Sequence, residues 1–84
     1  MEGKTVKFFG AAWCGDCVRS QALLEHHGVN FSYHDVDTDE NIRKEAAELS
    51  GRPNIPVLLF PDGSILTEPN NAILEKKLFD LEML

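Results

Sequence analysis

The segment Ala12-Trp13-Cys14-Gly15-Asp16-Cys17 decides how this chain of 84 residues is organised, because it contains both of the chain's cysteines. Residues 4–9, just before it, are rich in β-branched and aromatic side chains and predict a strand. After it, a helix can begin with Cys14 as the N-cap and run to His27, with Gly28 as the stop. The cysteines are therefore expected at the junction between a strand and the first turn of a helix.

This position suits two cysteines that form and break a disulfide. Residues three apart in a helix are neighbours, so the two thiols can close a disulfide across one turn. The unpaired N–H groups and the positive dipole end at a helix N-terminus favour a thiolate there. We expect Cys14, exposed at the cap, to be the attacking nucleophile. Cys17, one turn further on and against the core, is expected to resolve the mixed disulfide.

Asp16 is the unusual residue between the cysteines. Its negative charge lies beside the expected thiolate and offsets part of the stabilisation that the helix terminus provides. Asp16 is therefore predicted to tune the pKa of the thiol and to make the disulfide harder to reduce than a neutral residue would. Arg19 follows three residues later, where it can form an ion pair with Asp16 on the helix surface.

The remaining sequence predicts further strands and helices. Residues 29–36 alternate apolar and polar side chains, which is typical of a strand. Asp37 and Glu40 have the spacing of a capping box, for a helix that ends at Ser50-Gly51. The later elements are an apolar strand at 57–60, a turn at 61–64, a short strand at 65–67 and a helix that starts within 68–71.

The resulting order, β-α-β-α-β-β-α, predicts an α/β fold in a single domain spanning residues 1–84. Its first β-α-β unit must be parallel and right-handed. The last two strands are joined by a tight turn at Asp62-Gly63, so they are expected to be antiparallel. The prediction is a four-stranded mixed sheet with helices on both faces.

Composition narrows the choice of partners. The formal net charge of −6 argues against a nucleic-acid partner, because binding a phosphate backbone needs clustered Lys and Arg. The longest apolar run, Val57–Phe60, is far too short to span a membrane. No signal-peptide segment follows Met1-Glu2-Gly3-Lys4, so we expect the reducing cytoplasm as the location. The protein is separately expected to be a monomer.

Several segments together resemble the thioredoxin superfamily, and most closely its small glutaredoxin-like proteins of the mycoredoxin group. Trp13-Cys14-Gly15-Asp16-Cys17 is similar to the W-C-x-x-C that follows the first strand in that family, and Asn54-Ile55-Pro56-Val57 is similar to its T-V-P-T. Asp62-Gly63-Ser64 and Thr67-Glu68-Pro69 resemble the mycoredoxin D-G-[ST] and T-N-P. The resemblance covers nearly the whole chain and implies a thioredoxin-like (glutaredoxin) fold and a thiol–disulfide oxidoreductase.

Further substrate-binding residues are expected around the dithiol. By the resemblance, Pro56 would follow a cis bond and face the cysteines, and the backbone of Ile55 would pair with an incoming disulfide. Thr67 belongs to the T-N-P-like segment and is a third candidate. From their positions alone, Trp13 could be a platform beside the dithiol or an ordinary edge residue. Arg52 could hold a substrate carboxylate or be a solvated loop residue.

Two segments depart from the family pattern. Glutaredoxins usually carry Pro-Tyr between the cysteines, where the tyrosine helps to form the glutathione site, whereas this chain has Gly15-Asp16. The Gly-Gly that follows the fourth strand is replaced by Leu66-Thr67-Glu68-Pro69. A mycothiol-type thiol or a protein disulfide is therefore favoured over glutathione as the partner. Electrons would come from such a thiol or from a thioredoxin-type reductase, with no organic cofactor.

A metal-binding module is the alternative function. A Cys-x-x-Cys pair can be half of a zinc site, and the chain also has His26, His27 and His34. The sequence has no second Cys-x-x-Cys, however, and His26 and His27 are more simply explained as last-turn partners of the helix dipole. The two cysteines could also hold an iron–sulfur cluster between two chains. The favoured interpretation is a redox disulfide without a metal.

Overall fold

Four strands form one mixed sheet in the order β2-β1-β3-β4. This computed structural model describes residues 4–84. β1 (Val6–Gly10) pairs in parallel with β2 (Phe31–Asp35) and antiparallel with β3 (Val57–Leu59), and β4 (Ile65–Thr67) pairs antiparallel with β3. The predicted four-stranded mixed sheet, including its antiparallel final pair, is confirmed.

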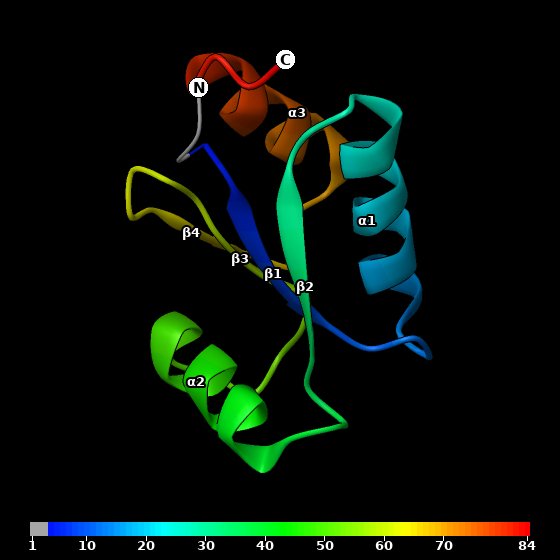
Figure 1. Ribbon diagram of the computed structural model, residues 1–84, viewed down its shortest axis with the longest axis vertical. Coiled ribbons are helices and arrows are strands. Elements are labelled where there is room, and N and C mark those ends of the chain that lie inside the picture. Colours follow the sequence, from blue (N-terminus) through cyan, green and yellow to red (C-terminus); the bar gives the residue numbers. More distant parts are fainter. Residues whose placement is uncertain (1–3) are drawn as a thin grey trace.

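Three helices cover the two faces of this sheet. α1 (Gly15–His26) and α3 (Asn71–Asp80) lie side by side on one face, and α2 (Glu40–Ser50) packs against the other (Figure 1). The order β-α-β-α-β-β-α is the predicted one. No helix within residues 4–84 is long and apolar enough to cross a membrane.

The N-cap of α2 lies within the predicted run 37–40, but the capping-box spacing of Asp37 and Glu40 indicated the wrong residue. Asp39, not Asp37, caps this helix, because the Asp39 side chain accepts a hydrogen bond from the N–H of Asn41 at 2.8 Å. The carboxylate of Asp37 is engaged elsewhere, with one oxygen on the Trp13 side chain and the other on Arg43. The local spacing of acidic residues could not distinguish two candidate caps two positions apart.

The other boundaries differ from the prediction by one or two residues. α1 ends at His26 with His27 as its C-cap, and Gly28 follows in the left-handed conformation, with φ of 67°, that makes glycine a suitable stop. α3 begins after the N-cap Asn70, whose side chain accepts a hydrogen bond from the N–H of Ile73 at 2.8 Å. β2 is shorter than the predicted 29–36, since its ladder with β1 spans five residues.

The core lies around the central strand β1. Phe8 and Phe9 point to opposite faces of the sheet, and both are fully buried because helices cover each face. Leu24 from α1 and Leu74 and Leu78 from α3 complete the core on their face. The carboxyl end of β1 is therefore held rigidly, and it leads directly into the segment with the two cysteines.

Candidate functional site

Cys14 is the N-cap of α1, as the sequence predicts. Its backbone is extended, with φ of −89° and ψ of 112°, and its Sγ accepts a hydrogen bond from the N–H of Cys17 at 3.2 Å. The sulfur thus takes the place that a Ser or Asp oxygen has in an ordinary N-cap. Both cysteines are free thiols. A negative charge on this sulfur would face the unpaired N–H groups of the first helical turn.

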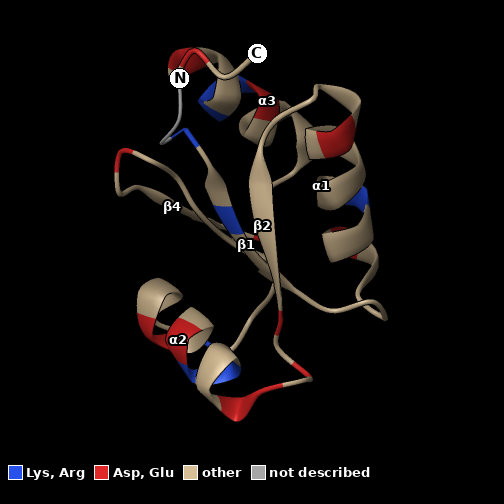
Figure 2. Cartoon of the chain, viewed as in Figure 1, with Lys and Arg blue, Asp and Glu red and all other residues tan. Residues whose placement is uncertain are grey.

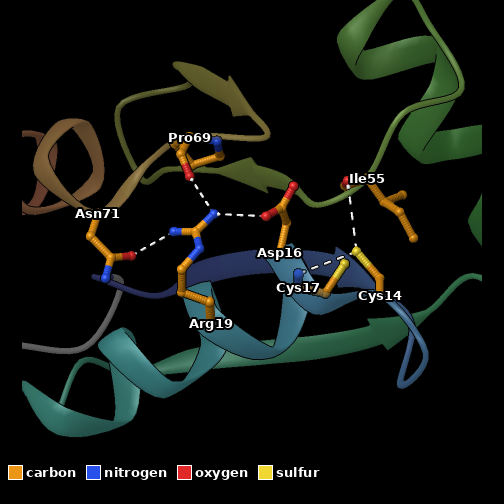
Figure 3. Close-up of polar contacts among 7 residues, drawn as sticks. All are labelled: Cys14, Asp16, Cys17, Arg19, Ile55, Pro69 and Asn71. Carbon is orange, nitrogen blue, oxygen red and sulfur yellow. Dashed lines mark hydrogen bonds and ion pairs between the residues drawn. The ribbon is translucent and has the colours of Figure 1, made fainter.

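The expectation that Cys14 is exposed was wrong, since only 9% of the residue is accessible. The cause is the loop before β3, in which the carbonyl oxygen of Ile55 lies 3.9 Å from the Cys14 Sγ (Figure 3). The Ile55–Pro56 bond is cis, as the resemblance implies. Cys14 lies instead in the wall of an open cleft of about 500 Å³. The cleft is lined by Trp13, Cys14, Gly15, Asp16, Pro53, Asn54, Ile55 and Glu68.

Cys17 is buried behind Cys14, with 1% of the residue accessible. It packs against Gly10 at the end of β1, where a Cβ on residue 10 would come within 3.0 Å of the Cys17 Sγ. Burial, together with a hydrogen bond to the Cys14 sulfur, raises the pKa of the Cys17 thiol to about 12. The charge of Asp16 acts in the same direction on this pKa, though it is a smaller contribution. Cys17 therefore keeps its proton at neutral pH in the reduced protein.

Trp13 forms an exposed wall of the cleft, with 69% of the residue accessible. Its indole N–H donates a hydrogen bond to Asp37 Oδ2 at 2.5 Å. The other oxygen of Asp37 pairs with Arg43 from α2. This pairing fixes the ring although so much of it is in solvent, so Trp13 is not a core residue, and its role as a platform stays a prediction.

Arg19 and Asp16 form the predicted ion pair, with Arg19 Nη2 3.3 Å from Asp16 Oδ1. Arg19 also donates to the carbonyl oxygen of Pro69 at 3.2 Å and to Asn71 Oδ1 at 2.6 Å (Figure 3). The guanidinium therefore holds the start of α1 against the start of α3. Asp16 remains half-exposed and lines the cleft, so its charge acts on whatever approaches Cys14.

The remaining candidates divide between the cleft and its surroundings. Ile55 lines the cleft, and Pro56 is buried beneath it. Thr67 pairs with Val57 at the end of β4 and is not among the lining residues. Arg52 is exposed and lies along a separate groove beside α2. The structure thus places neither Arg52 nor Thr67 in the cleft.

Glu68 lines the cleft and was not singled out from the sequence. It adopts a left-handed backbone conformation with φ of 52°, and its N–H donates to the carbonyl oxygen of Pro56 at 2.9 Å. The signal that could have identified it is its position directly after Thr67, at the end of a strand expected to pair with the one that follows Pro56.

Groups of three or more His, Cys, Asp and Glu side chains that could hold a metal ion do not occur within residues 4–84. His27 instead pairs with Glu75 at 3.0 Å, and His34 contacts Ser32 at 3.0 Å. A zinc site formed by the two cysteines and a histidine of the same chain is therefore not favoured by this part of the structure.

A dithiol at the start of α1, facing a cis-proline in a β-α-β-α-β-β-α fold, defines a thioredoxin-like protein. The sequence model of the glutaredoxin family matches residues 6–65. A predicted glutaredoxin of Mycobacterium tuberculosis is 33% identical over 75 residues, which cover 83% of this chain and 84% of that protein. The chain belongs to the glutaredoxin family, and this membership supports the activity of a thiol–disulfide oxidoreductase, a redox enzyme.

Solved structures agree on the fold. The glutaredoxin of Archaeoglobus fulgidus superimposes with a TM-score of 0.78 at 22% identity, over 87% of this chain and 84% of that one. A dithiolic glutaredoxin of Trypanosoma brucei brucei superimposes with a TM-score of 0.68 at 22% identity, over 99% of this chain and 84% of that one. At this identity the similarity establishes the thioredoxin-like architecture that places the dithiol.

Proposed function

We propose that this protein reduces disulfides by a dithiol mechanism in which Cys14 is the nucleophile and Cys17 the resolving thiol. The observation that carries the proposal is the position of the Cys14 sulfur. It lies at the N-cap of α1, accepts the N–H of Cys17 at 3.2 Å and lines an open cleft. Cys17 has no comparable access, because 1% of it is accessible. This difference in access supports Cys14 as the thiol that attacks first.

The reaction has two exchange steps. The Cys14 thiolate forms a bond to one sulfur of the substrate disulfide, and the substrate's S–S bond breaks so that the other sulfur leaves as a thiolate. Cys17 then bonds to the Cys14 sulfur and expels the second substrate thiolate. The substrate gains two electrons, the protein dithiol loses two, and the Cys17 proton goes to a departing thiolate. A small thiol or a thioredoxin-type reductase restores the dithiol.

The environment of Cys17 fits the timing of the second step. Two of the causes that raise its pKa to about 12 are the hydrogen bond and the charge of Cys14. Both weaken when the Cys14 sulfur becomes part of a neutral mixed disulfide. Cys17 is thus held as a thiol before the first step and becomes easier to deprotonate after it, which suppresses attack in the wrong order.

The substrate would lie in the cleft between Trp13 and the loop that precedes β3. The backbone of Ile55, beside the Cys14 sulfur, is proposed to pair with the chain on one side of the substrate disulfide. Trp13, fixed by Asp37, would cover the other side. Pro56 connects the loop before β3 to the end of β4, because its carbonyl oxygen accepts a hydrogen bond from the N–H of Glu68.

We further propose a mycoredoxin-like partner, either a mixed disulfide with a mycothiol-type thiol or a protein disulfide. Gly15-Asp16 replaces the Pro-Tyr that is typical of glutathione-using relatives. Mycothiol carries no carboxylate, so the acidic groups of the cleft do not oppose it. A free dithiol needs a reducing compartment, so the cytoplasm is the proposed location. The protein is proposed to act there as a monomer.

The test is a reductase assay with the two thiols side by side. Mixed disulfides of mycothiol and of glutathione are offered to wild type, Cys14→Ser and Cys17→Ser, with a thioredoxin reductase as a third electron source. The expected result is turnover with the mycothiol system or with the reductase, and its loss in Cys14→Ser. Full activity of Cys14→Ser would overturn the mechanism. A visible absorbance band in anaerobically purified protein would point to an iron–sulfur cluster instead.

A further inference from the structure

The residues that line the cleft carry negative charge and no positive charge. Asp16 and Glu68 are both among them, and none of the lining residues is Lys, Arg or His. The two carboxylates come from different elements, since Asp16 belongs to the first turn of α1 and Glu68 follows β4. A substrate that reaches Cys14 therefore meets two acidic side chains in the lining of the cleft.

Glu68 is the less neutralised of the two. The Asp16 carboxylate is 3.3 Å from Arg19, whereas within residues 4–84 the Glu68 carboxylate forms no hydrogen bond or ion pair. The Glu68 backbone is nevertheless fixed, because its N–H donates to Pro56 at 2.9 Å and φ is 52°. The Glu68 backbone is thus anchored beside the cis-proline, while its side chain stays free to meet the substrate.

The surface on the Trp13 side of the cleft is acidic as well. Asp37 lies against the Trp13 indole, and the segment 35–40 contributes three further acidic residues. Figure 2 shows these acidic residues in the segment that leads into α2. Arg43 neutralises Asp37, but the chain as a whole has a formal net charge of −6. These carboxylates therefore repel an approaching anion and attract a cation.

We propose that Glu68 is a specificity-determining residue, through which the cleft selects disulfides flanked by positive charge over disulfides flanked by carboxylates. The inference rests on the proposed function, because it concerns the substrate that Cys14 attacks. The bond changes are those of the two exchange steps given above. Glu68 acts on the encounter and on the bound substrate, and it takes no part in the transfer of electrons.

The experiment compares wild type and three variants on three small disulfides. The substrates are cystamine, which is cationic, dithiodipropionate, which is anionic, and bis(hydroxyethyl) disulfide, which is neutral and serves to normalise each rate. The variants are Glu68→Gln, Glu68→Lys and Glu25→Gln. Glu25 is an exposed residue about three turns along α1 from Cys14, so its replacement changes the net charge equally without touching the cleft.

For Glu68→Gln we expect the cystamine-to-dithiodipropionate ratio of kcat/KM to fall by about threefold or more at low ionic strength. The fall should shrink at high salt, because exposed charges are screened there. Glu68→Lys should invert the preference, and Glu25→Gln should leave the ratio at the wild-type value. Disulfide-linked peptides of equal length, with Lys or Glu beside the cysteines, show whether the charge preference extends from small disulfides to protein segments.

An unchanged ratio in both Glu68→Gln and Glu68→Lys would overturn the inference, as would an equal shift in Glu25→Gln. Neither outcome affects the proposed function, provided that the neutral disulfide is still reduced and that Cys14→Ser abolishes the reduction. Persistent reduction of the neutral disulfide by Cys14→Ser would instead contradict the proposed function, whatever the charge preference.

Discussion

Gly10 determines how closely Cys17 can approach the central strand. A Cβ added to Gly10 would lie 2.7 Å from a ring carbon of Phe8 and 3.0 Å from the Cys17 sulfur, and both neighbours are buried. Because the core is closely packed, we expect Gly10→Ala to lower the free energy of unfolding by about 1–3 kcal/mol. It should also slow the release of substrate from the mixed disulfide, since Cys17 is displaced. Urea denaturation and single-turnover kinetics measure the two effects.

Gly15 provides the matched control for this substitution. No atom lies within 4 Å of a Cβ added there, and its position in the first turn of α1 tolerates alanine. Gly15→Ala should leave the stability unchanged or raise it by up to about 1 kcal/mol. Equal destabilisation by the two substitutions would contradict the steric role of Gly10.

The raised pKa of Cys17 makes the stability of the reduced protein depend on alkaline pH. The pKa of Cys17 in the folded protein is about 12, above its ordinary value of 9.0, so the folded state holds the proton more tightly than the unfolded state does. The resulting stabilisation is fully present below pH 9 and is lost as the pH rises toward 12. Reduced wild type should therefore lose stability between pH 9 and pH 11 more steeply than Cys17→Ala, measured by thermal unfolding. Parallel curves would contradict this prediction.

Asp16 is predicted to make the disulfide harder to reduce. Its carboxylate lines the cleft beside Cys14 and is one of the causes that raise the Cys17 pKa, so it disfavours negative charge at the reduced dithiol. Asp16→Asn should make the reduction potential less negative by about 10–30 mV, because Arg19 already offsets part of the charge. Equilibration with dithiothreitol redox buffers measures the potential, with Glu25→Gln as the control. A more negative potential in Asp16→Asn would exclude this role.

At the scale of elements, Arg19 connects the helix that bears the dithiol to the one that ends the fold. Its contacts with Asp16, Pro69 and Asn71 join α1 to the start of α3. Arg19→Ala should cost about 1–2 kcal/mol of unfolding free energy, and Arg19→Lys should recover only part of it, because an ammonium cannot reproduce the planar fork.

The control for Arg19 is the exposed pair of Lys76 and Asp80, 3.0 Å apart within α3. Lys76→Ala should cost only about 0.3–0.5 kcal/mol, as expected for a surface pair within one helix. Urea denaturation of both variants decides the matter. If both substitutions cost the same, Arg19 does not couple the two helices.

The elements themselves were largely predictable from local patterns, and the errors have physical causes. Alternation, apolar runs and glycine stops identified every helix and strand of the described residues. The capping-box spacing indicated the wrong N-cap for α2, because the Asp37 carboxylate binds the indole N–H of Trp13, a residue 24 positions away in the sequence. A local pattern carries no information on such a contact, which exists only after the sheet has formed.

At the scale of the whole molecule, the dithiol was predictable and the shape of its cleft was not. Spacing alone placed the two cysteines at the strand–helix junction where the structure has them, and the resemblance supplied the cis bond before Pro56. The low exposure of Cys14 and the position of Glu68 in the cleft lining depend on how the loop before β3 and the end of β4 pack beside the start of α1. These features are produced by tertiary packing, so the sequence pattern could not reveal them.

Trapping the mixed disulfide distinguishes the roles of the two cysteines. Cys17→Ser is incubated with bis(hydroxyethyl) disulfide and analysed by intact and peptide mass spectrometry. We expect one mercaptoethanol adduct, on the peptide that contains Cys14, whereas wild type should lose two hydrogens and keep no adduct. Cys14→Ser should react far more slowly, because Cys17 is buried. An adduct that forms as fast on Cys17 of Cys14→Ser, or none on Cys14 of Cys17→Ser, would contradict the account.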